Sequence, residues 1–163
     1  MVDVALATSA APTVYRPTEA GGYRLIDGGI WANNPIMLAV VEAMISYDVP
    51  RERIKVLSVG CGYSPFYVTR SMGAGGFWHW RKAIAAAMHA QALSATSQVK
   101  LLLGPENVIR IDPSISGPEI ELDDYRRAVD ALLPAVGPAA LLHRDRVREV
   151  FLDRKALPFI PEP

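Results

Sequence analysis

The sequence predicts an α/β fold in which helices pack on the faces of a sheet. Helical and strand patterns alternate along the chain, and the strand patterns are short, rich in β-branched residues and followed by glycines. The chain has 163 residues, which is enough for one ordinary domain. Its composition, 50% apolar and 21% charged, is that of a globular protein rather than a disordered one.

Four elements are expected in the first part of the chain. They are a helix at residues 4–11, a strand at 23–26, a helix at 36–44 and a strand at 54–59. The first helix consists of small apolar residues and ends at Pro12, so we expect it to be buried, against partners that lie elsewhere. The second helix has Asn34 in the position of an N-cap and Pro35 in its first turn, where a missing N–H costs nothing.

Four further elements complete the predicted order. They are a long helix at residues 78–103, a strand at 108–111, and two helices at 123–133 and 138–152. Gly104 and Pro105 are expected to end the long helix. Residues 13–22 and 112–121 are expected to be loops, because proline and glycine gather there.

Charge and composition exclude several classes of function. Lys plus Arg and Asp plus Glu number 17 each, so no net positive charge attracts nucleic acid. No apolar stretch reaches the about 20 residues of a membrane-spanning helix, and the N-terminus has no signal-peptide pattern. Cys61 is the only cysteine, which excludes an internal disulfide and fits a reducing compartment. We therefore expect a cytoplasmic protein, with peripheral contact at a membrane left open.

The most informative stretch of the sequence surrounds Asp27. This acid follows a predicted strand and precedes the pair Gly28 and Gly29, a position at which α/β proteins bind ligands. The glycines would let the backbone turn and leave the carboxylate uncovered. Such a carboxylate can act as a general base on a nearby hydroxyl. An Asp-Gly pair is equally typical of a turn in which the aspartate binds its own backbone, and the residues alone leave both interpretations open.

Three motifs in this part of the chain give it a family resemblance. Residues 7–12 spell Ala-Thr-Ser-Ala-Ala-Pro, Asp27 begins Asp-Gly-Gly, and Asn33 begins Asn-Asn-Pro. In this order and at these intervals they resemble the patatin-like phospholipases. Residues 56–62, Val-Leu-Ser-Val-Gly-Cys-Gly, are similar to the family's next strand and turn. The resemblance covers residues 7–62 best and is weaker beyond them.

The resemblance implies a lipid acyl hydrolase that uses a Ser-Asp dyad. In that family a serine on a Gly-x-Ser-x-Gly elbow attacks the ester carbonyl and the aspartate of the Asp-Gly-Gly motif takes the serine proton. Asp27 matches that aspartate, and Gly28, Gly29, Asn33 and Asn34 match the residues that support it. The implied fold is the C-terminal portion of a three-layer α/β/α sandwich. The implied substrates are phospholipids or other acyl esters, with no metal and no organic cofactor.

The sequence departs from the family pattern at the nucleophile. It contains no Gly-x-Ser-x-Gly, and Ser58 has Val56 where the elbow has glycine. The glycine-rich loop that supplies oxyanion donors in the family is also not found before Asp27. We therefore expect residues 1–163 to be the C-terminal part of the catalytic domain, inactive by itself because a base without its nucleophile does no chemistry.

Two other functions were weighed against this one. The chain could be a non-catalytic remnant that binds a partner, complements a separate N-terminal half or associates with itself. We also expect it to be marginally stable, because its first strand would have an unprotected edge. A nucleotide-binding module is disfavoured, because neither the glycines at 60–62 nor those at 73–76 form a complete phosphate-binding motif.

The remaining candidates have simple structural explanations. The three histidines, His79, His89 and His143, lack metal-ligand spacing and are expected to be structural or at the surface. Cys61 is expected to be a small buried residue in a tight turn rather than a reactive thiol. The aromatic and basic residues 77–82 fit a packed helix start better than a membrane contact.

Overall fold

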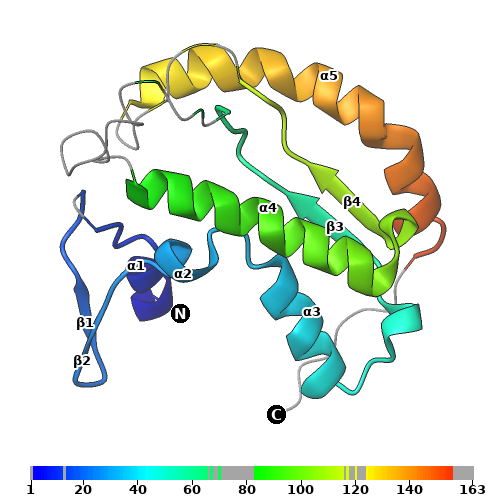
Figure 1. Ribbon diagram of the computed structural model, residues 1–163, viewed down its shortest axis with the longest axis horizontal. Coiled ribbons are helices and arrows are strands. Elements are labelled where there is room, and N and C mark those ends of the chain that lie inside the picture. The colour runs from blue at the N-terminus through cyan, green and yellow to red at the C-terminus, as the bar shows by residue number, and fades with distance from the viewer. Residues whose placement is uncertain are drawn as a thin grey trace.

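The computed structural model describes residues 2–12, 14–65, 67, 70, 83–115, 117, 120 and 124–155. The fold is mixed α/β, as predicted, with two small sheets. β3 (Val56–Val59) and β4 (Val108–Ile111) form a parallel pair, and β1 (Thr18–Ala20) and β2 (Tyr23–Leu25) form an antiparallel pair. Figure 1 shows the parallel pair between two long helices, with the antiparallel pair at the opposite side of the molecule.

The two long helices are α4 (Ala83–Leu103) and α5 (Tyr125–Phe151), and both contact β4. Val108 packs in a core cluster with α4, whereas the next residue, Ile109, points to the other face and is buried as well. β4 is therefore covered on both faces, which gives the helix–sheet–helix layering expected of a partial sandwich.

The hydrophobic core joins α4 to α3 (Ile36–Ile45) and β4. Ile36 and Val40 of α3 lie four residues apart and so point to one side of that helix. Val99 of α4 is fully buried against this cluster. Short 3-10 turns at Arg51–Arg53 and Pro105–Asn107 lead into β3 and β4. The core therefore depends on residues from both halves of the chain.

The first strand is part of a hairpin and not of the parallel sheet. Gly21 and Gly22 connect β1 to β2 with φ of +58° and +80°, the left-handed conformation that a two-residue hairpin turn requires. The expected loop at residues 13–22 therefore contains a strand that the sequence analysis missed. The strand before Asp27 was predicted correctly. It pairs with β1, however, and not with the strands of the parallel sheet, because the short Gly21–Gly22 turn brings β1 beside it.

Two predictions about helices were also wrong. α1 (Val2–Thr8) ends before its predicted end at residue 11, and none of its residues is buried in the described chain, where its main neighbour is β1. The two predicted C-terminal helices form the single helix α5, which contains both Pro134 and Pro138. Proline bends a helix without always ending it, and Figure 1 shows that α5 is curved.

Two other helices, α3 and α4, agree well with their predicted positions. α4 ends at Leu103, and Gly104 follows with φ of +88°, a conformation that favours glycine. α3 and β4 also match their predicted ranges closely. The short α2 (Gly29–Ala32) was not predicted. The expected start of the long helix at residues 78–82 lies outside the described residues, and no helix in the described part is long and apolar enough to cross a membrane.

The fully buried Val99 provides a test of this core. Val99→Ala removes two methyl groups from a side chain with 0% exposure, and we expect it to lower the free energy of unfolding by about 2 kcal/mol. Leu101→Ala on the same helix is the matched control, because Leu101 is 86% exposed and its loss should change stability by less than about 0.5 kcal/mol. Urea unfolding followed by circular dichroism measures both, and equal effects would contradict the assigned core.

Candidate active site around Asp27

Asp27 lies in a turn between β2 and α2 and is half-buried. Its Oδ1 accepts a hydrogen bond from the Gly29 N–H at 2.7 Å, and its own N–H donates to the Ala10 carbonyl at 3.0 Å. The carboxylate therefore closes a local turn, which confirms one of the two interpretations of the Asp-Gly pair. Because only Oδ1 takes part in this turn, the bond does not exclude a chemical role for Oδ2.

The two glycines after Asp27 differ in whether a side chain would fit. At Gly29 a side chain would crowd the Asp27 carboxylate, whereas at Gly28 neither the backbone conformation nor the surroundings require glycine. A Cβ on Gly29 would lie 3.1 Å from Asp27 Oδ1 and 3.6 Å from Met88 Cε, so a side chain would press on the carboxylate. Gly28 has φ of −64° and ψ of −12°, which any residue adopts, and a Cβ there would meet nothing within 4 Å. Neither glycine has a positive φ, so the prediction that the pair is needed for a sharp backbone turn was wrong, and only Gly29 is required, for the space that it leaves beside the carboxylate.

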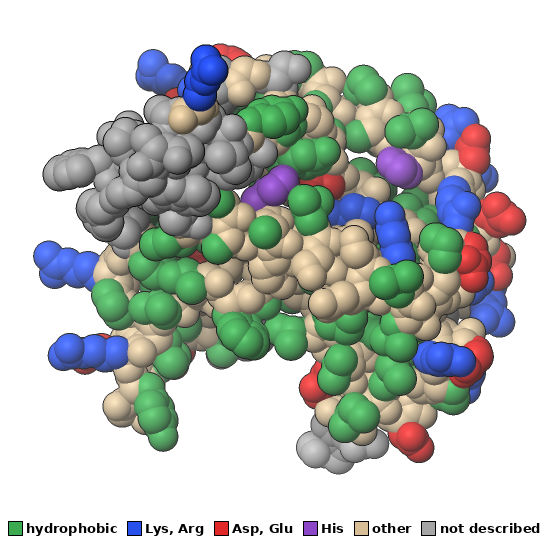
Figure 2. Space-filling view, viewed as in Figure 1, with side chains coloured by type: hydrophobic (Ala, Val, Ile, Leu, Met, Phe, Trp, Pro, Cys, Tyr) green, Lys and Arg blue, Asp and Glu red, His purple; other side chains and the backbone are tan. Residues whose placement is uncertain are grey.

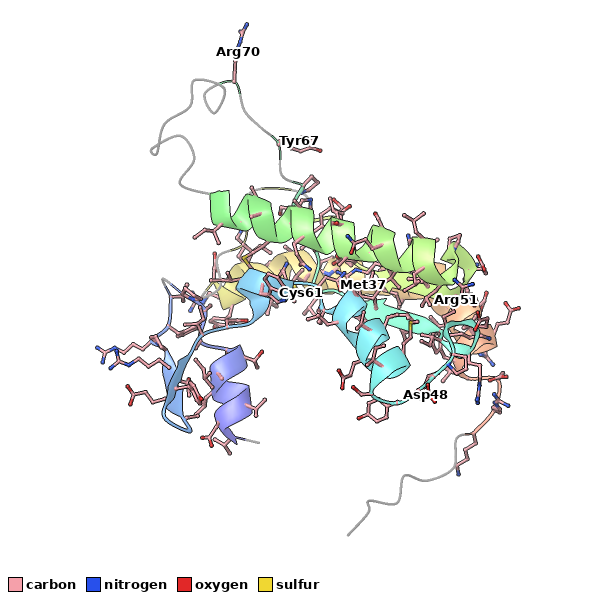
Figure 3. The ribbon with its side chains drawn as sticks, turned by 60° about the horizontal axis from the view of Figure 1, so that its bottom comes forward. Met37, Asp48, Arg51, Cys61, Tyr67 and Arg70 are labelled. Carbon is pink, nitrogen blue, oxygen red and sulfur yellow. The ribbon has the colours of Figure 1, made fainter. Side chains whose placement is uncertain are left out.

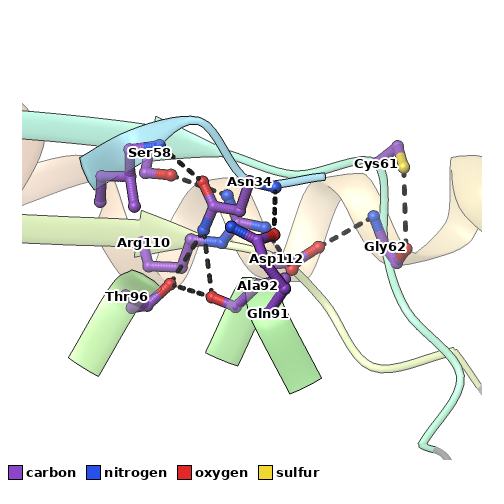
Figure 4. Close-up of polar contacts among 10 residues, drawn as sticks. Asn34, Ser58, Cys61, Gly62, Gln91, Ala92, Thr96, Arg110 and Asp112 are labelled. Carbon is purple, nitrogen blue, oxygen red and sulfur yellow. Dashed lines mark hydrogen bonds and ion pairs between the residues drawn. The ribbon is translucent and has the colours of Figure 1, made fainter. Parts of the chain in front are cut away.

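Asn34 fixes the segment after Asp27 to α4. Its side chain is 5% exposed; its Nδ2 donates to Thr96 Oγ1 at 2.9 Å and to the Ala92 carbonyl at 3.4 Å. Its backbone N–H donates to Gln91 Oε1 at 3.2 Å. Figure 4 shows these contacts between the start of α3 and one side of α4. A buried amide with this many partners holds two helices in a defined relative position.

Asn34 also accepts a hydrogen bond at the start of α3. Its Oδ1 receives the Ile36 N–H at 3.3 Å, so it satisfies a helix donor, but the residue at the N-cap of α3 is Pro35 and not Asn34 as predicted. Asn33 is exposed, at the end of α2, and makes no such contacts with the described residues. The two asparagines of the motif therefore have different roles: Asn34 is structural, and Asn33 faces solvent.

A second polar cluster lies at the carboxyl ends of β3 and β4. Arg110 donates to Ser58 Oγ at 2.7 Å and to Asp112 Oδ2 at 2.6 Å, and the Gly62 N–H donates to Asp112 Oδ1 at 3.0 Å. A Cβ on Gly60 would collide with the Asp112 carboxylate, which explains a glycine at that position. Figure 4 shows this cluster near Asn34.

The polar cluster at these strand ends was not predicted from the sequence. Its signal was the acid Asp112 directly after a predicted strand, with Arg110 two residues earlier on the same face. This is the same pattern that drew attention to Asp27. Ser58 was weighed only as a nucleophile and rejected; its side chain instead accepts a hydrogen bond from the guanidinium of Arg110.

A cavity of about 810 Å³ lies beside β3. It is lined by the consecutive residues 56–63, by the start of α3 and by one side of α4, and both asparagines of the motif reach it. Asp27 is not one of its lining residues. A smaller hollow of about 390 Å³ lies at the hairpin and contains none of the predicted site residues. The larger cavity is therefore the one next to the candidate site.

The remaining candidates do not form a metal or thiol site. His89 lies on α4 with its ring centroid 5.7 Å from that of Tyr63. Cys61 is exposed, so the prediction that it is buried was wrong: no described part of the chain covers its turn. In the part of the chain that the structure describes, no three His, Cys, Asp or Glu residues gather as a metal site. His79 and residues 73–82 lie outside the described residues.

The sequence around Asp27 matches known proteins. Residues 1–40 match the family described as patatin-like phospholipase. The chain is 36% identical over 66 residues to the cGAMP-activated phospholipase of Escherichia coli (strain TW11681). It is 34% identical over 91 residues to the cGAMP-activated phospholipase of Vibrio cholerae serotype O1 (strain ATCC 39315 / El Tor Inaba N16961). No solved structure matches the chain significantly.

These matches confirm the relationship to the patatin-like phospholipase family that the motifs predicted. The aligned segments cover 37% and 48% of this chain but 18% and 25% of the two relatives. The chain thus spans a quarter or less of the length of these relatives.

The contrast between the two asparagines gives a prediction. Asn34→Ala removes a buried donor and acceptor and leaves Thr96 Oγ1 and the Ile36 N–H without their partner, so we expect a loss of about 2–3 kcal/mol in stability. Asn33→Ala, the neighbouring and exposed control, should change stability by less than about 0.5 kcal/mol. Urea unfolding gives the two values. Faster amide exchange across α2 and the start of α3 should accompany Asn34→Ala only. Equal effects of the two substitutions would contradict the role of Asn34 in connecting this segment to α4.

Proposed function

We propose that this chain supplies the general base, Asp27, of a patatin-like lipid acyl hydrolase with a Ser-Asp dyad. The observation that supports this most directly is the geometry of the carboxylate. The Gly29 N–H donates a hydrogen bond to Asp27 Oδ1 at 2.7 Å, and no described residue donates to Oδ2. A carboxylate held by one oxygen, with the other available, is arranged to accept a proton from a positioned hydroxyl.

The proposed chemistry divides between this chain and a nucleophile. The serine Oγ would attack the ester carbonyl while Asp27 accepts its proton, and the resulting acid would protonate the leaving alcohol. Asn34 would act as a positioning residue, because it ties the segment that carries Asp27 to α4. The substrates would be phospholipids or other acyl esters, as the names of the relatives suggest. This division needs no metal and no organic cofactor.

The isolated chain is proposed to be inactive. Its sequence contains no Gly-x-Ser-x-Gly, and removal of one member of a coupled catalytic unit costs most of the rate enhancement. We place the protein in the cytoplasm, with peripheral contact at a membrane when it meets its lipid substrate. The aromatic residues considered for that contact, at 77–82, lie outside the described residues.

A second candidate function is that of a non-catalytic partner-binding fragment. It is favoured by the apolar side chains that the described part of the chain leaves at its surface. Figure 2 shows a hollow in the lower edge of the molecule, with hydrophobic side chains on both sides of it. The large apolar side chains exposed on α2 and α3 include Ile30, Trp31, Leu38, Val41 and Ile45. An apolar surface of this kind is typical of an interface with another polypeptide.

A chimera separates the two candidates. The part of the Escherichia coli relative that precedes its aligned segment would be fused to this chain, and fatty-acid release from phosphatidylglycerol vesicles measured with cGAMP present. We expect hydrolysis by the chimera and none by the isolated chain. Asp27→Asn should lower kcat by roughly 10³-fold or more, because the amide cannot accept the serine proton.

Asp48→Asn is the matched control for this experiment. It makes the same chemical change at an exposed residue beyond the far end of α3, where φ of +49° suits asparagine (Figure 3). Its activity should equal that of the parent chimera. Hydrolysis that survives Asp27→Asn, or ester turnover by the isolated chain, would refute the proposed function.

A further inference from the structure

The outer surface of α5 is apolar, and no described part of the chain covers it. Val129, Leu133 and Val136 follow one another at intervals of four and three residues, so they share one face of the helix. They are 47%, 64% and 55% exposed, and Leu141, at 66%, continues this surface beyond them. Figure 1 places α5 at the outside of the molecule, and Figure 2 shows hydrophobic side chains along the same margin.

The inner side of α5 attaches the helix to the sheet. Leu132 lies against the turn after β3, where a Cβ on Gly62 would come within 3.0 Å of its Cδ2. Near the other end of the helix, Arg146 donates to the Glu106 carbonyl at 2.7 Å. The helix is therefore held in place without its outer surface, which remains available for another contact.

Arginines lie on both sides of the apolar outer surface. Residues 131–142 contain no charged side chain, whereas Arg126 precedes them and Arg144 and Arg148 follow them, and all three arginines are exposed. The whole helix has five arginines against three acids, a net charge of +2, although the charges of the chain as a whole are balanced. This charge pattern is complementary to an anionic bilayer, where aliphatic side chains enter the acyl boundary and guanidinium groups bind headgroup phosphates.

The two prolines of α5 favour a hydrated boundary over a dry protein interface. In an α-helix each carbonyl accepts from the N–H four residues later, and proline has no N–H. The carbonyls of Asp130 and Pro134 therefore lack this donor, because Pro134 and Pro138 occupy the positions that would supply it. All three residues are exposed. A packed polypeptide would bury these acceptors without partners, which is costly, whereas water reaches them at headgroup depth.

The first half of α5 lies at the same end of the sheet as the candidate site. The turn after β3 contacts α5, and the ring of Tyr63 in this turn has its centroid 5.7 Å from that of His89 on α4. Met88, the preceding residue of α4, lies beside Gly29 in the Asp27 turn. A bilayer along α5 would thus lie near the Asp27 end of the sheet without contacting the residues of the candidate site.

We propose that the outer surface of α5 is a membrane-contact surface, which lies in the headgroup region of an anionic bilayer. The side chains of Leu133 and Leu141 would enter the bilayer, and the arginines on either side would bind its phosphates. This inference rests on the proposed function, because a hydrolase of phospholipids meets its substrate at a bilayer. It adds the surface through which that contact is made.

Binding of the isolated chain to vesicles tests this surface. We expect the chain to sediment with vesicles of phosphatidylglycerol and phosphatidylcholine in equal parts, and to bind pure phosphatidylcholine roughly 10-fold less tightly. Leu133→Asp and Leu141→Asp should each weaken binding to the mixed vesicles by roughly 10-fold or more, because a carboxylate replaces an inserted aliphatic group. Leu101→Asp is the matched control at an exposed leucine of α4, and it should bind as the parent chain does.

Three results of this experiment would overturn the proposal. They are the absence of binding by the folded parent chain, undiminished binding by the two α5 variants, and equal weakening by the α4 control. A dimer that forms without lipid and is lost in Leu133→Asp would also overturn it, because a second copy would then cover the surface. Circular dichroism verifies that each variant is folded.

Amide exchange in the parent chain is a second measurement, and it needs no substitution. Mixed vesicles should slow exchange in residues 129–142 by roughly 10-fold, because the bilayer limits opening of the helix on which it lies. This measurement decides if the α5 variants do not fold. Unchanged exchange in these residues while the chain is bound to vesicles would overturn the proposal.

The result is separable from that of the proposed function. The isolated chain is proposed to be inactive, so its vesicle binding does not depend on the chemistry of Asp27. Vesicle binding through α5 by a chimera that does not hydrolyse lipid would support the contact surface and refute the proposed function. Hydrolysis by a chimera in which vesicles leave exchange in α5 unchanged would overturn the contact surface alone.

Discussion

The arrangement of this chain depends on the buried amide of Asn34. The hairpin, the Asp27 turn and α2 precede this residue, and the core of α3, α4 and β4 follows it. Asn34 donates to Thr96 and accepts from Ile36, so one side chain joins the end of the first region to the beginning of the second. An unpaired amide at this depth would be costly, and this cost gives the junction a single geometry. The position of the Asp27 carboxylate relative to α4 follows from that geometry.

The two strands of the parallel sheet differ in how completely their edges are paired and their faces are covered. β4 has β3 at one edge and a helix on each face, whereas β3 has β4 at one edge and no described strand at the other. The polar cluster of Ser58, Arg110 and Asp112 stabilises the carboxyl ends of both strands, so the exposed edge is held in a regular conformation.

Predictions from the sequence succeeded where local chemistry determines the structure. Gly104 ends α4 because its left-handed φ favours glycine, and the β-branched run of β4 was located correctly. They failed where the outcome depends on neighbours distant in the sequence. The burial expected for α1 and for Cys61 required cover that the described chain does not provide, and the pairing partner of β2 was decided by the Gly21–Gly22 turn. The Asp112 cluster was missed because its partners meet only after β3 and β4 pair.

The two interpretations of Asp27 are compatible, because each concerns a different oxygen. The Gly29 N–H binds Oδ1 at 2.7 Å, and this bond orients the plane of the carboxylate. A base that is already oriented loses less entropy when it accepts a proton from a hydroxyl than a freely rotating one does. The close approach at Gly29 explains why the second glycine of the motif is needed even though its backbone conformation is ordinary. A turn that uses one oxygen and leaves the other available thus serves both folding and the proposed catalysis.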